Sequence, residues 1–302
     1  MKFSSLLSMF LALTMFLSIG GCSGNNGAWE KIFSDSYDEI QYDNRAGIIW
    51  AVDFLDTKLY RLDPATVKRE EILLPTDVRV SNICFSNTLW LAGFNMKTGV
   101  NMIMKYSENK FEEVLQSAVI LGCKVSASGE ILFWEKYKIF SVIARDEIQE
   151  IQGIREKTII DVCRANDGQL WMLTQDGKIY INDNSEDWVL FADSQMARNI
   201  FVDDSYAWVA NNGGIYRYQI SSQGNKENLL EASLGFYQDI YQDQNGSIWI
   251  VTSENIWIGV DDVFSMVDLP YDTRLIKNNE FDFKNNILYI STNQGIFSLL
   301  AR

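Results

Sequence analysis

Residues 167–181 read DGQLWMLTQDGKIYI, and this phrase decides the fold. Two turns, each with an Asp-Gly pair, precede two short runs rich in Ile, Leu, Trp and Tyr. Such runs between tight turns are typical of β-strands joined as hairpins. Related phrases occur as AGIIWAVDFLDTKLYRL (46–62), NGSIWIVTSENIWIG (245–259) and NNILYISTNQGIFSL (285–299). The chain is therefore built from a repeat.

The repeat has a period of about 40 residues. A large apolar residue, here called the anchor, follows the first turn of each unit at spacings of 37 to 42 residues. The anchors are Trp50, Trp90, Leu132 or Phe133, Trp171, Trp208, Trp249 and Tyr289. Each unit holds four strand-like segments that are apolar almost throughout, so both faces of each sheet are covered. Seven such units predict an all-β chain folded as a seven-bladed β-propeller with four-stranded blades.

The two ends of the repeat region complement each other. The last unit stops after GIFSLLAR, its third strand, so one outer strand is missing there. The segment AWEKIFSDS (28–36) reads like the fourth-strand phrase DWVLFADS (187–194). Residues 28–34 are therefore predicted to complete the last blade and close the ring, which pairs strand edges that would otherwise be free.

The first 22 residues look like an export signal. Their apolar stretch is shorter than the roughly 20 residues that a membrane span needs, and suits a signal peptide. The ending Ile19-Gly20-Gly21-Cys22 resembles the bacterial lipobox. This resemblance implies cleavage before Cys22 and attachment of a diacylglyceryl group, with acyl chains such as palmitate, to its sulfur. An ordinary signal peptide or membrane anchor with a chance cysteine is the alternative.

Three segments follow from this interpretation. Residues 1–21 are predicted to be a lipoprotein signal peptide, residues 22–27 the anchored cysteine and a short linker, and residues 28–302 the propeller. Multiple acyl chains hold a protein stably on a membrane, at roughly 0.8 kcal/mol per buried CH₂. We expect a protein on the cell membrane or outer membrane, facing away from the cytoplasm and touching lipid through this anchor only. Which membrane carries it stays open.

Composition excludes several kinds of chemistry. The 302-residue chain has a formal charge of −14, which disfavours nucleic acid as a partner. It has no histidine, which excludes Ser-His-Asp and Cys-His nucleophile pairs and histidine-ligated metals. No cofactor or metal is expected, and we expect a monomer. Cys84, Cys123 and Cys163 lie in or beside apolar runs and are expected to be buried, although one disulfide among them is possible.

The phrases NDGQLWMLTQDGKIYI and QNGSIWIVTSENIWI resemble the repeats of the two-component-regulator propeller family. Units of that family run roughly D-x-x-G-x-[IL]-W-[IVL]-x-T-x-x-G-[IL], and the resemblance covers all seven units. It implies a binding propeller outside the cytoplasm, of the kind that serves as the sensor part of membrane-bound regulators. Because no kinase or DNA-binding segment follows the propeller, signalling by this chain itself is doubtful.

One polar residue precedes the first-strand apolar pair in six of the units. These residues lie eight to eleven positions before the anchor, and the innermost strands of a propeller line its channel, so they are expected to form a ring there. They are Glu39, Asn82, Asp161, Asn199, Asp239 and Glu280. The ring is either a structural set of hydrogen bonds with bound water or a site for a cation or polyol at the channel mouth.

A second set of candidates comes from the loops between blades and between second and third strands, which share one face of a propeller. Tyr and Arg are frequent in binding sites because they offer large area with a polar tip or planar donors. Solvated surface is the alternative for each of them. The candidates are Tyr37, Arg79, Arg198, Tyr237, Tyr271 and Arg274, together with the blade-two loop at 95–101.

Two functions from different classes remain. The first is a non-catalytic binding or scaffold lipoprotein that presents the propeller to an envelope protein or glycan. The alternative is an extracytoplasmic carbohydrate-active hydrolase or lyase that uses carboxylates and Tyr at the propeller mouth. A funnel with two carboxylates about 5–10 Å apart beside an Arg or Tyr would favour catalysis. A scaffold like the propeller lipoprotein of outer-membrane protein assembly is a third possibility, which the blade count disfavours because that protein has eight blades.

Overall fold

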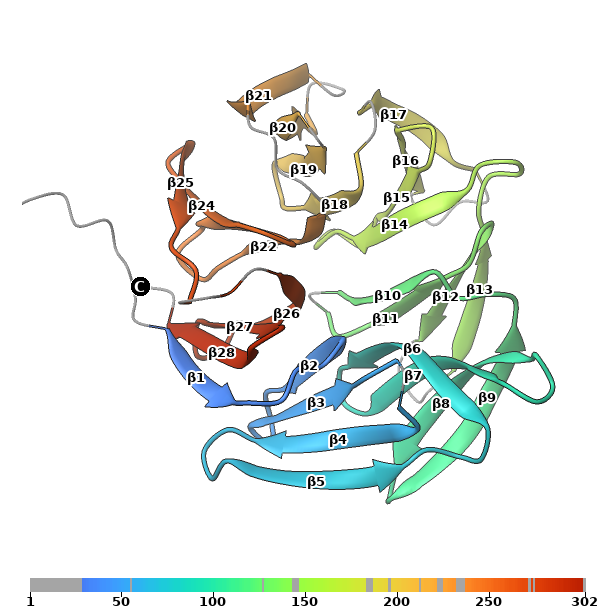
Figure 1. Ribbon diagram of the computed structural model, residues 1–302. Helices are drawn as coiled ribbons and strands as arrows, with labels where there is room; N and C mark the ends of the chain where they lie inside the picture. The colour runs from blue at the N-terminus through green and yellow to red at the C-terminus, as the bar shows by residue number, and fades with distance from the viewer. Residues whose placement is uncertain are drawn as a thin grey trace, which may run out of the picture.

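The computed structural model describes residues 29–300 except 55, 127, 143–146, 183–186, 195–196, 212, 222–224, 232–236, 271–272 and 274. The described residues form seven antiparallel four-stranded sheets, arranged as blades around a common centre (Figure 1). The predicted all-β, seven-bladed propeller is confirmed. No helix in the described part of the chain has the length and hydropathy needed to cross a membrane. The predicted signal peptide, Cys22 and the linker lie outside the described residues.

Each blade runs from an inner strand at the channel to an outer strand at the rim. Blade 1 consists of β2 (Glu39–Asp43), β3 (Ile48–Val52), β4 (Lys58–Asp63) and β5 (Lys68–Leu73). Blade 2 consists of β6 (Val78–Phe85), β7 (Leu89–Asn95), β8 (Asn101–Ser107) and β9 (Lys110–Ser117). Blade 3 consists of β10 (Gly122–Val125), β11 (Ile131–Trp134), β12 (Lys138–Val142) and β13 (Ile148–Gln152).

The remaining blades repeat this order. Blade 4 consists of β14 (Ile159–Arg164), β15 (Leu170–Thr174), β16 (Lys178–Asn182) and β17 (Val189–Asp193). Blade 5 consists of β18 (Asn199–Val202), β19 (Tyr206–Asn211), β20 (Gly214–Gln219) and β21 (Asn225–Glu231). Blade 6 consists of β22 (Tyr237–Gln242), β23 (Ile248–Thr252), β24 (Ile256–Val260) and β25 (Val263–Val267). Blade 7 consists of β26 (Ile276–Asp282), β27 (Ile287–Thr292), β28 (Gly295–Leu300) and, from the other end of the chain, β1 (Glu30–Phe33).

The ring closes where β1 pairs antiparallel with β28 (Figure 1). Glu30 lies opposite Ser298 in this pair. Gly295 has a φ of +127°, and a Cβ there would lie 2.0 Å from the carbonyl oxygen of Phe33, so glycine is required for the two strands to approach. The prediction that the N-terminal segment supplies the missing outer strand is confirmed.

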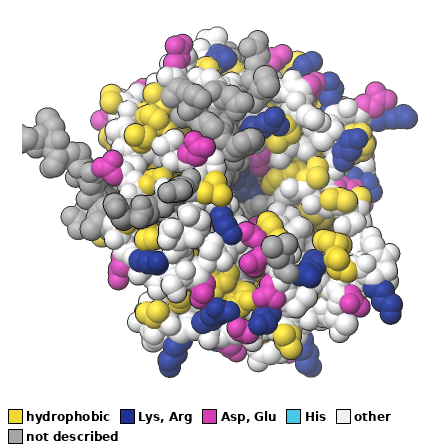
Figure 2. All heavy atoms as spheres, in the orientation of Figure 1, with side chains coloured by type: hydrophobic (Ala, Val, Ile, Leu, Met, Phe, Trp, Pro, Cys, Tyr) yellow, Lys and Arg dark blue, Asp and Glu magenta, His cyan; other side chains and the backbone are white. Residues whose placement is uncertain are grey.

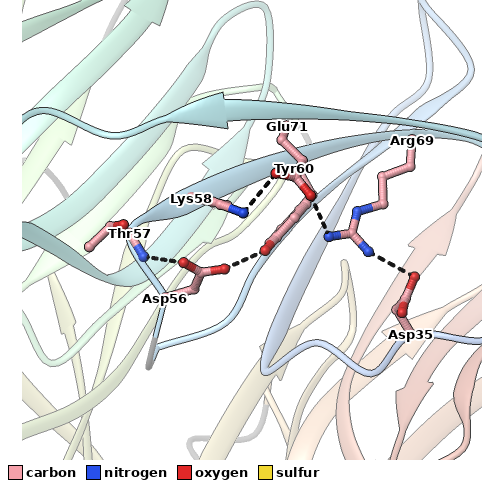
Figure 3. A network of polar contacts seen from close by, with 7 residues as sticks. All are labelled: Asp35, Asp56, Thr57, Lys58, Tyr60, Arg69 and Glu71. Carbon is pink, nitrogen blue, oxygen red and sulfur yellow. Dashed lines mark hydrogen bonds and ion pairs between the residues drawn. The ribbon is translucent and has the colours of Figure 1, made fainter.

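A network of charged side chains fastens the segment that follows β1 to the rim of blade 1 (Figure 3). Arg69 on β5 donates to Asp35 at 3.0 Å and to Glu71 at 2.8 Å, and its guanidinium lies 4.4 Å from the centre of the Tyr60 ring. Lys58 reaches Glu71 at 2.7 Å. The closing segment is therefore held to the first blade as well as to the last.

The anchors pack between blades, as their sevenfold repetition predicts. Every one is buried, with an exposed fraction of 7% or less. Each faces the next blade: Trp50 packs with Leu91 of blade 2, and Tyr289 packs with Ile49 of blade 1 across the closure. In blade 3 the anchor is Leu132, because Leu132 faces blade 4 whereas Phe133 faces blade 2. The hydrophobic core is thus a series of layers between blades and not one central mass.

The aspartate of the repeat pattern builds the turn after the inner strand. Asp243 Oδ1 accepts hydrogen bonds from the backbone N–H of Asn245 and Ser247, and its Oδ2 accepts one from Trp249 Nε1 at 2.9 Å. Asp203 does the same for its own turn and for Trp208 Nε1 at 2.6 Å. In blades 5 and 6 one carboxylate therefore sets the turn and fixes the buried anchor.

Candidate functional site

The inner strands place five of the six predicted ring residues at one level of the channel. We define the ring position as the residue that pairs with the second residue after the anchor. By this register it is occupied, in blades 1 to 7, by Glu39, Asn82, Gly122, Asp161, Asn199, Asp239 and Asn278. Five of the six predicted residues therefore hold the ring position of their blades, and no residue of blade 3 was predicted for it.

The assignment of Glu280 to this ring is wrong. Glu280 pairs with the anchor Tyr289 itself, two residues further along β26, and Asn278 holds the ring position opposite Ser291. Residues two apart on a strand point to the same side. Asn278 and Glu280 both lie eight to eleven residues before the anchor, so spacing in the sequence does not distinguish them. Only the pairing register of the strands does.

Hydrogen bonds from ring residues join neighbouring blades. Asn278 Oδ1 accepts from the backbone N–H of Ile40, and Asp161 Oδ2 accepts from that of Ile200 at 2.8 Å. Glu39 likewise accepts from the N–H of Ile83. In each case the donor is the backbone N–H of the residue that comes directly after the ring position in the sequence of the next blade. The structural role expected for the ring is thus visible at these three blade junctions.

Blade 3 departs from the ring because it carries glycine there. A Cβ at Gly122 would lie 2.2 Å from the indole ring of Trp134, so the indole occupies the space that a ring side chain would need. Trp134 Nε1 donates to the carbonyl of Ile160 in blade 4 at 3.0 Å. An indole therefore makes the contact between blades 3 and 4 that side chains of the ring make elsewhere.

Lys124 is the functional candidate that the sequence reasoning missed. It lies on β10 opposite the anchor Leu132, and its Nζ is 3.1 Å from Asp161 Oδ2 and 3.6 Å from Asp239 Oδ1. The same Nζ donates to the carbonyl of Ile200 at 3.1 Å. One ammonium thus bridges the ring carboxylates of blades 4 and 6. The signal was present in the phrase GCKV (122–125), where a lysine interrupts an inner strand of an acidic ring.

The charges around Lys124 are buried and strongly coupled. Burial lowers the pKa of Lys124, but the neighbouring carboxylates of Asp161 and Asp239 outweigh it and raise that pKa above its usual value. Burial raises the pKa of Asp161, and Lys124 opposes this increase. The lysine therefore stays charged and serves as the counter-ion of both acids.

Two other channel carboxyls have no such counter-ion. Burial raises the pKa of Glu39 to about 8, opposed only by the hydrogen bond from Ile83, and its Oε2 has no hydrogen-bond partner. Burial, together with the charges of Asp239 and Glu39, raises the pKa of Glu280 well above its usual value. The side of the channel formed by blades 7 and 1 thus favours protonated carboxyls.

The three cysteines that the structure describes are thiols. Cys84, Cys123 and Cys163 are all free, and the side chains of Cys84 and Cys123 are hydrogen-bonded to each other across blades 2 and 3. Burial raises the pKa of both, and raises that of Cys163 to about 11. Cys84 and Cys163 are buried, as expected from the sequence, whereas Cys123 is half-buried at the wall of the mouth cavity.

A cavity of about 160 Å³ opens beside Lys124 at the end of the channel where the inner strands begin. Asp161, Asn199 and Asp239 line it together with the exposed Arg198, so four of the predicted residues meet here. Acidic and basic side chains surround a hollow near the middle of the face seen in Figure 2. Among the residues that the structure describes, no three Cys, Asp or Glu side chains come together as a metal site.

The other face candidates are dispersed. Arg79 is half-buried at the start of β6, and the loop at 95–101 joins the second and third strands of blade 2 with Met96 57% exposed. Tyr271 and Arg274 lie outside the described residues, as does the side chain of Tyr237.

The expectation that Tyr37 lies on the ligand face is wrong. Its side chain is 2% exposed and packs against Tyr60, and its backbone is hydrogen-bonded to Ser291 Oγ. The closing strand β1 ends four residues earlier, so the chain passes under the rim of blade 1 at this point. Burial raises the Tyr37 pKa to about 12.

Comparison with known proteins shows the fold and leaves the family open. No protein-family model and no curated protein matches the chain. Among solved structures, a catalytically inactive histidine-to-alanine variant of virginiamycin B lyase from Staphylococcus aureus with quinupristin has a TM-score of 0.70 at 13% identity, with 91% of this chain and 99% of that chain covered.

Two further neighbours come from bacterial surfaces. PorZ, a surface component of the type-IX secretion system of Porphyromonas gingivalis, has a TM-score of 0.65 at 15% identity over 91% of this chain and 38% of that one. The extracellular domain of the putative hybrid two-component system BT3049 from B. thetaiotaomicron has a TM-score of 0.61 at 15% identity, with 88% and 40% covered. At these identities the likeness shows that this chain is a β-propeller.

Proposed function

We propose that this chain is a non-catalytic binding propeller, held outside the cytoplasm by a lipid on Cys22, that presents its channel mouth to an envelope protein or glycan. The observation that carries the proposal is the position of Lys124 between Asp161 and Asp239. Beside this ion-paired core stand the exposed guanidinium of Arg198 and the amide of Asn199, groups that suit recognition.

The arrangement of the two mouth carboxylates argues against acid–base catalysis by them. Asp161 Oδ2 accepts from Lys124 and Ile200, and its Oδ1 accepts from the N–H of Val162. A general acid or base needs a free lone pair or proton within reach of the substrate. Because Lys124 occupies the space between Asp161 and Asp239, the pair serves better as a rigid wall than as the two halves of a glycosidase site.

The alternative, a hydrolase or lyase, has one observation in its favour. Glu39 is a buried carboxyl with a raised pKa and an unpartnered oxygen, which are properties of general acids. Glu39 does not line the mouth cavity, however. The lyase neighbour is catalytically inactive when a histidine is replaced by alanine, and this chain has no histidine. Binding is therefore the better-supported function.

The location outside the cytoplasm rests on the lipobox-like Gly20-Gly21-Cys22. Two solved neighbours, described as a surface component and an extracellular domain, are compatible with it. Strand β1 begins only a few residues after Cys22 in the sequence. A lipid there would hold the propeller close to the membrane surface.

We expect the full-length chain, expressed in a bacterium fed an alkyne analogue of palmitate, to carry the label and to sediment with membranes. The Cys22→Ser variant should lose the label completely, because the thioether needs the sulfur of Cys22. Gel fluorescence after click coupling measures the label, and fractionation measures the location. Cys163→Ser is the matched control and should keep both. A label that persists in Cys22→Ser would contradict the lipid anchor.

The binding proposal predicts a ligand-dependent stabilisation that needs the channel mouth. The full-length protein in mild detergent is heated with fragments of envelope glycans while Trp fluorescence is followed. A glycan at 100 times its Kd should add about 2.7 kcal/mol to the free energy of unfolding. Arg198→Ala should abolish this gain, and Arg45→Ala, an exposed arginine in the turn after β2 on the opposite face, should not.

The other part of the proposal, binding to an envelope protein, is tested in intact cells. A photo-crosslinking amino acid at position 198 should trap an envelope protein, whereas the same group at position 45 should not. If no glycan stabilises the protein and no partner is trapped through position 198, the proposed binding function is wrong.

A further inference from the structure

A second cavity, of about 400 Å³, lies between blades 5 and 6 on the face opposite the channel mouth. The turn after β18 and the turn between β24 and β25 form its rim, and Arg217 on β20 lies on its wall. Each inner strand begins at the channel mouth and ends at this opposite face. The two cavities therefore lie at opposite ends of the inner strands. Its volume is within the range of about 300–1,000 Å³ typical of small-ligand sites.

Blade 6 carries glycine at the wall of this cavity, at a position where every other blade carries a side chain. The position in question lies on the third strand, opposite the residue before the anchor, and faces the preceding blade. In blade 6 it is Gly259. In the other blades it is Leu62, Tyr106, Val142, Asn182, Tyr218 and Leu299. A Cβ at Gly259 would lie 2.5 Å from the ring of Phe264 on β25, so glycine lets this ring pack against β24, and both residues line the cavity.

Arg217 forms a wall of this cavity with its charge already balanced. Its Nε donates to Glu227 at 2.5 Å, and its two terminal nitrogens form a bidentate pair with Asp262. Its guanidinium stacks on the Tyr206 ring at 4.3 Å and lies 5.6 Å from the centre of Trp208. Because every donor edge and one face are engaged, Arg217 is not available to hold an anionic ligand.

The remaining charge of the cavity is negative. Four carboxylates line it against the single guanidinium of Arg217: Asp203, Asp204, Asp261 and Asp262. Asp203 is used by its turn and by Trp208. Asp204 and Asp261 are exposed at the rim, where Asp204 Oδ1 accepts a hydrogen bond from Asn166 Nδ2 at 2.9 Å. The half-buried Phe264 stands beside them. The cavity therefore offers carboxylates and aromatic rings to whatever enters.

We propose that this cavity binds an ammonium or guanidinium group on an aliphatic stem, supplied either by a small organic amine or by a Lys or Arg side chain of a partner protein. Carboxylates pair with such a head group, and an aromatic ring within about 6 Å adds a cation–π attraction. A sugar fits less well, because Arg217 covers the face of Tyr206 and Trp208 is only 5% exposed. An anion is disfavoured by the three uncompensated carboxylates.

Calorimetric titration of the full-length protein with agmatine, which carries both head groups on a four-carbon stem, tests the chemistry. Asp204→Asn/Asp261→Asn keeps the shape and removes two charges, and should weaken binding at least tenfold. Asn tolerates the left-handed backbone at position 261, where φ is +49°. The matched control is Glu108→Gln, in the equivalent two-residue turn of blade 2 with a φ of +52°, which should bind like the unchanged protein.

A second variant tests the cavity itself. Leucine at position 259 reproduces Leu62 and Leu299, and Phe264→Ala removes the ring that a Cβ there would otherwise approach within 2.5 Å. Gly259→Leu/Phe264→Ala should therefore fold, and it should weaken agmatine binding because it replaces the aromatic wall of the cavity by an aliphatic side chain. An acetylated, amidated peptide Gly-Lys-Gly that binds at least tenfold more tightly than agmatine would identify a protein side chain as the source, and the reverse order a free amine.

Equal agmatine affinity in all variants, or binding of neutral N-acetylglucosamine oligosaccharides in its place, would overturn the inference. The inference is independent of the channel-mouth proposal, because it concerns the other face and other residues. Arg198→Ala, which should abolish binding at the mouth, should leave agmatine binding unchanged.

Discussion

Replacing Lys124 by methionine is expected to lower the free energy of unfolding by about 3–5 kcal/mol at pH 8, because it leaves a buried carboxylate without its counter-ion. Methionine keeps most of the volume and the flexible stem, so packing changes little. Asp161 has 4% of its side chain exposed and cannot recover the lost interaction from water. The loss should therefore come from charge.

The pH dependence of this loss identifies its cause. Burial already raises the pKa of Asp161 while Lys124 holds it down, so removing the lysine raises that pKa further. Protonation of this carboxyl removes the penalty of an unpaired charge, so the penalty should shrink as pH falls. The variant should accordingly lose clearly less stability at pH 5 than at pH 8.

Urea unfolding followed by Trp fluorescence at the two pH values measures both quantities. Lys110→Met, at an exposed position on β9, is the control and should change stability little at either pH. A penalty of the same size at pH 5 and pH 8 would mean that Lys124 acts by packing. No penalty at pH 8 would mean that the bridge between Asp161 and Asp239 does not form.

The blades could be predicted from the sequence because one physical requirement recurs seven times. Each inter-blade layer needs a large anchor, and each anchor follows a tight turn, which in blade 6 is held by the carboxylate of Asp243. The closing strand could be predicted for the same reason. The last repeat unit lacks an outer strand, and the N-terminal segment before the first unit reads as one. A packing requirement that recurs in every blade produces a sequence pattern with the same period.

The site could be predicted only in part, because its distinctive residues break the repeat. In blade 3, Gly122 leaves room for the indole of Trp134 and Lys124 adds a cation beside the ring. In blade 6, Gly259 leaves room for Phe264 at the wall of the cavity between blades 5 and 6. The assignment of Glu280 failed because strand register depends on loop lengths, which differ between blades. Tyr37 was misplaced because only the path of the chain under blade 1 buries it. A comparison of equivalent positions across blades would have found Gly259, since all six counterparts carry side chains.

Glu39→Gln is expected to remove about 4 kcal/mol of the pH dependence of stability between pH 5 and pH 9. The Glu39 pKa is about 8 in the folded protein against an ordinary value of 4.5, so the folded state holds the proton more tightly than the unfolded state does. The sign follows: this proton stabilises the fold fully below pH 4.5, and the contribution is lost as pH rises through 8. Glutamine can accept from the N–H of Ile83 as the carboxyl does, and it has no proton to lose.

Urea unfolding at pH 5, 7 and 9 provides the test. The unchanged protein should lose stability steadily on going to pH 9, and Glu39→Gln should lose about 4 kcal/mol less over the same interval. Glu147→Gln, an exposed glutamate before β13, is the matched control and should follow the unchanged protein. Parallel curves for the unchanged protein and Glu39→Gln would mean that Glu39 titrates alike in the folded and unfolded states. The side of the channel formed by blades 7 and 1 would then hold an ionised carboxylate, and its unpartnered oxygen would have to be satisfied by water or a bound cation.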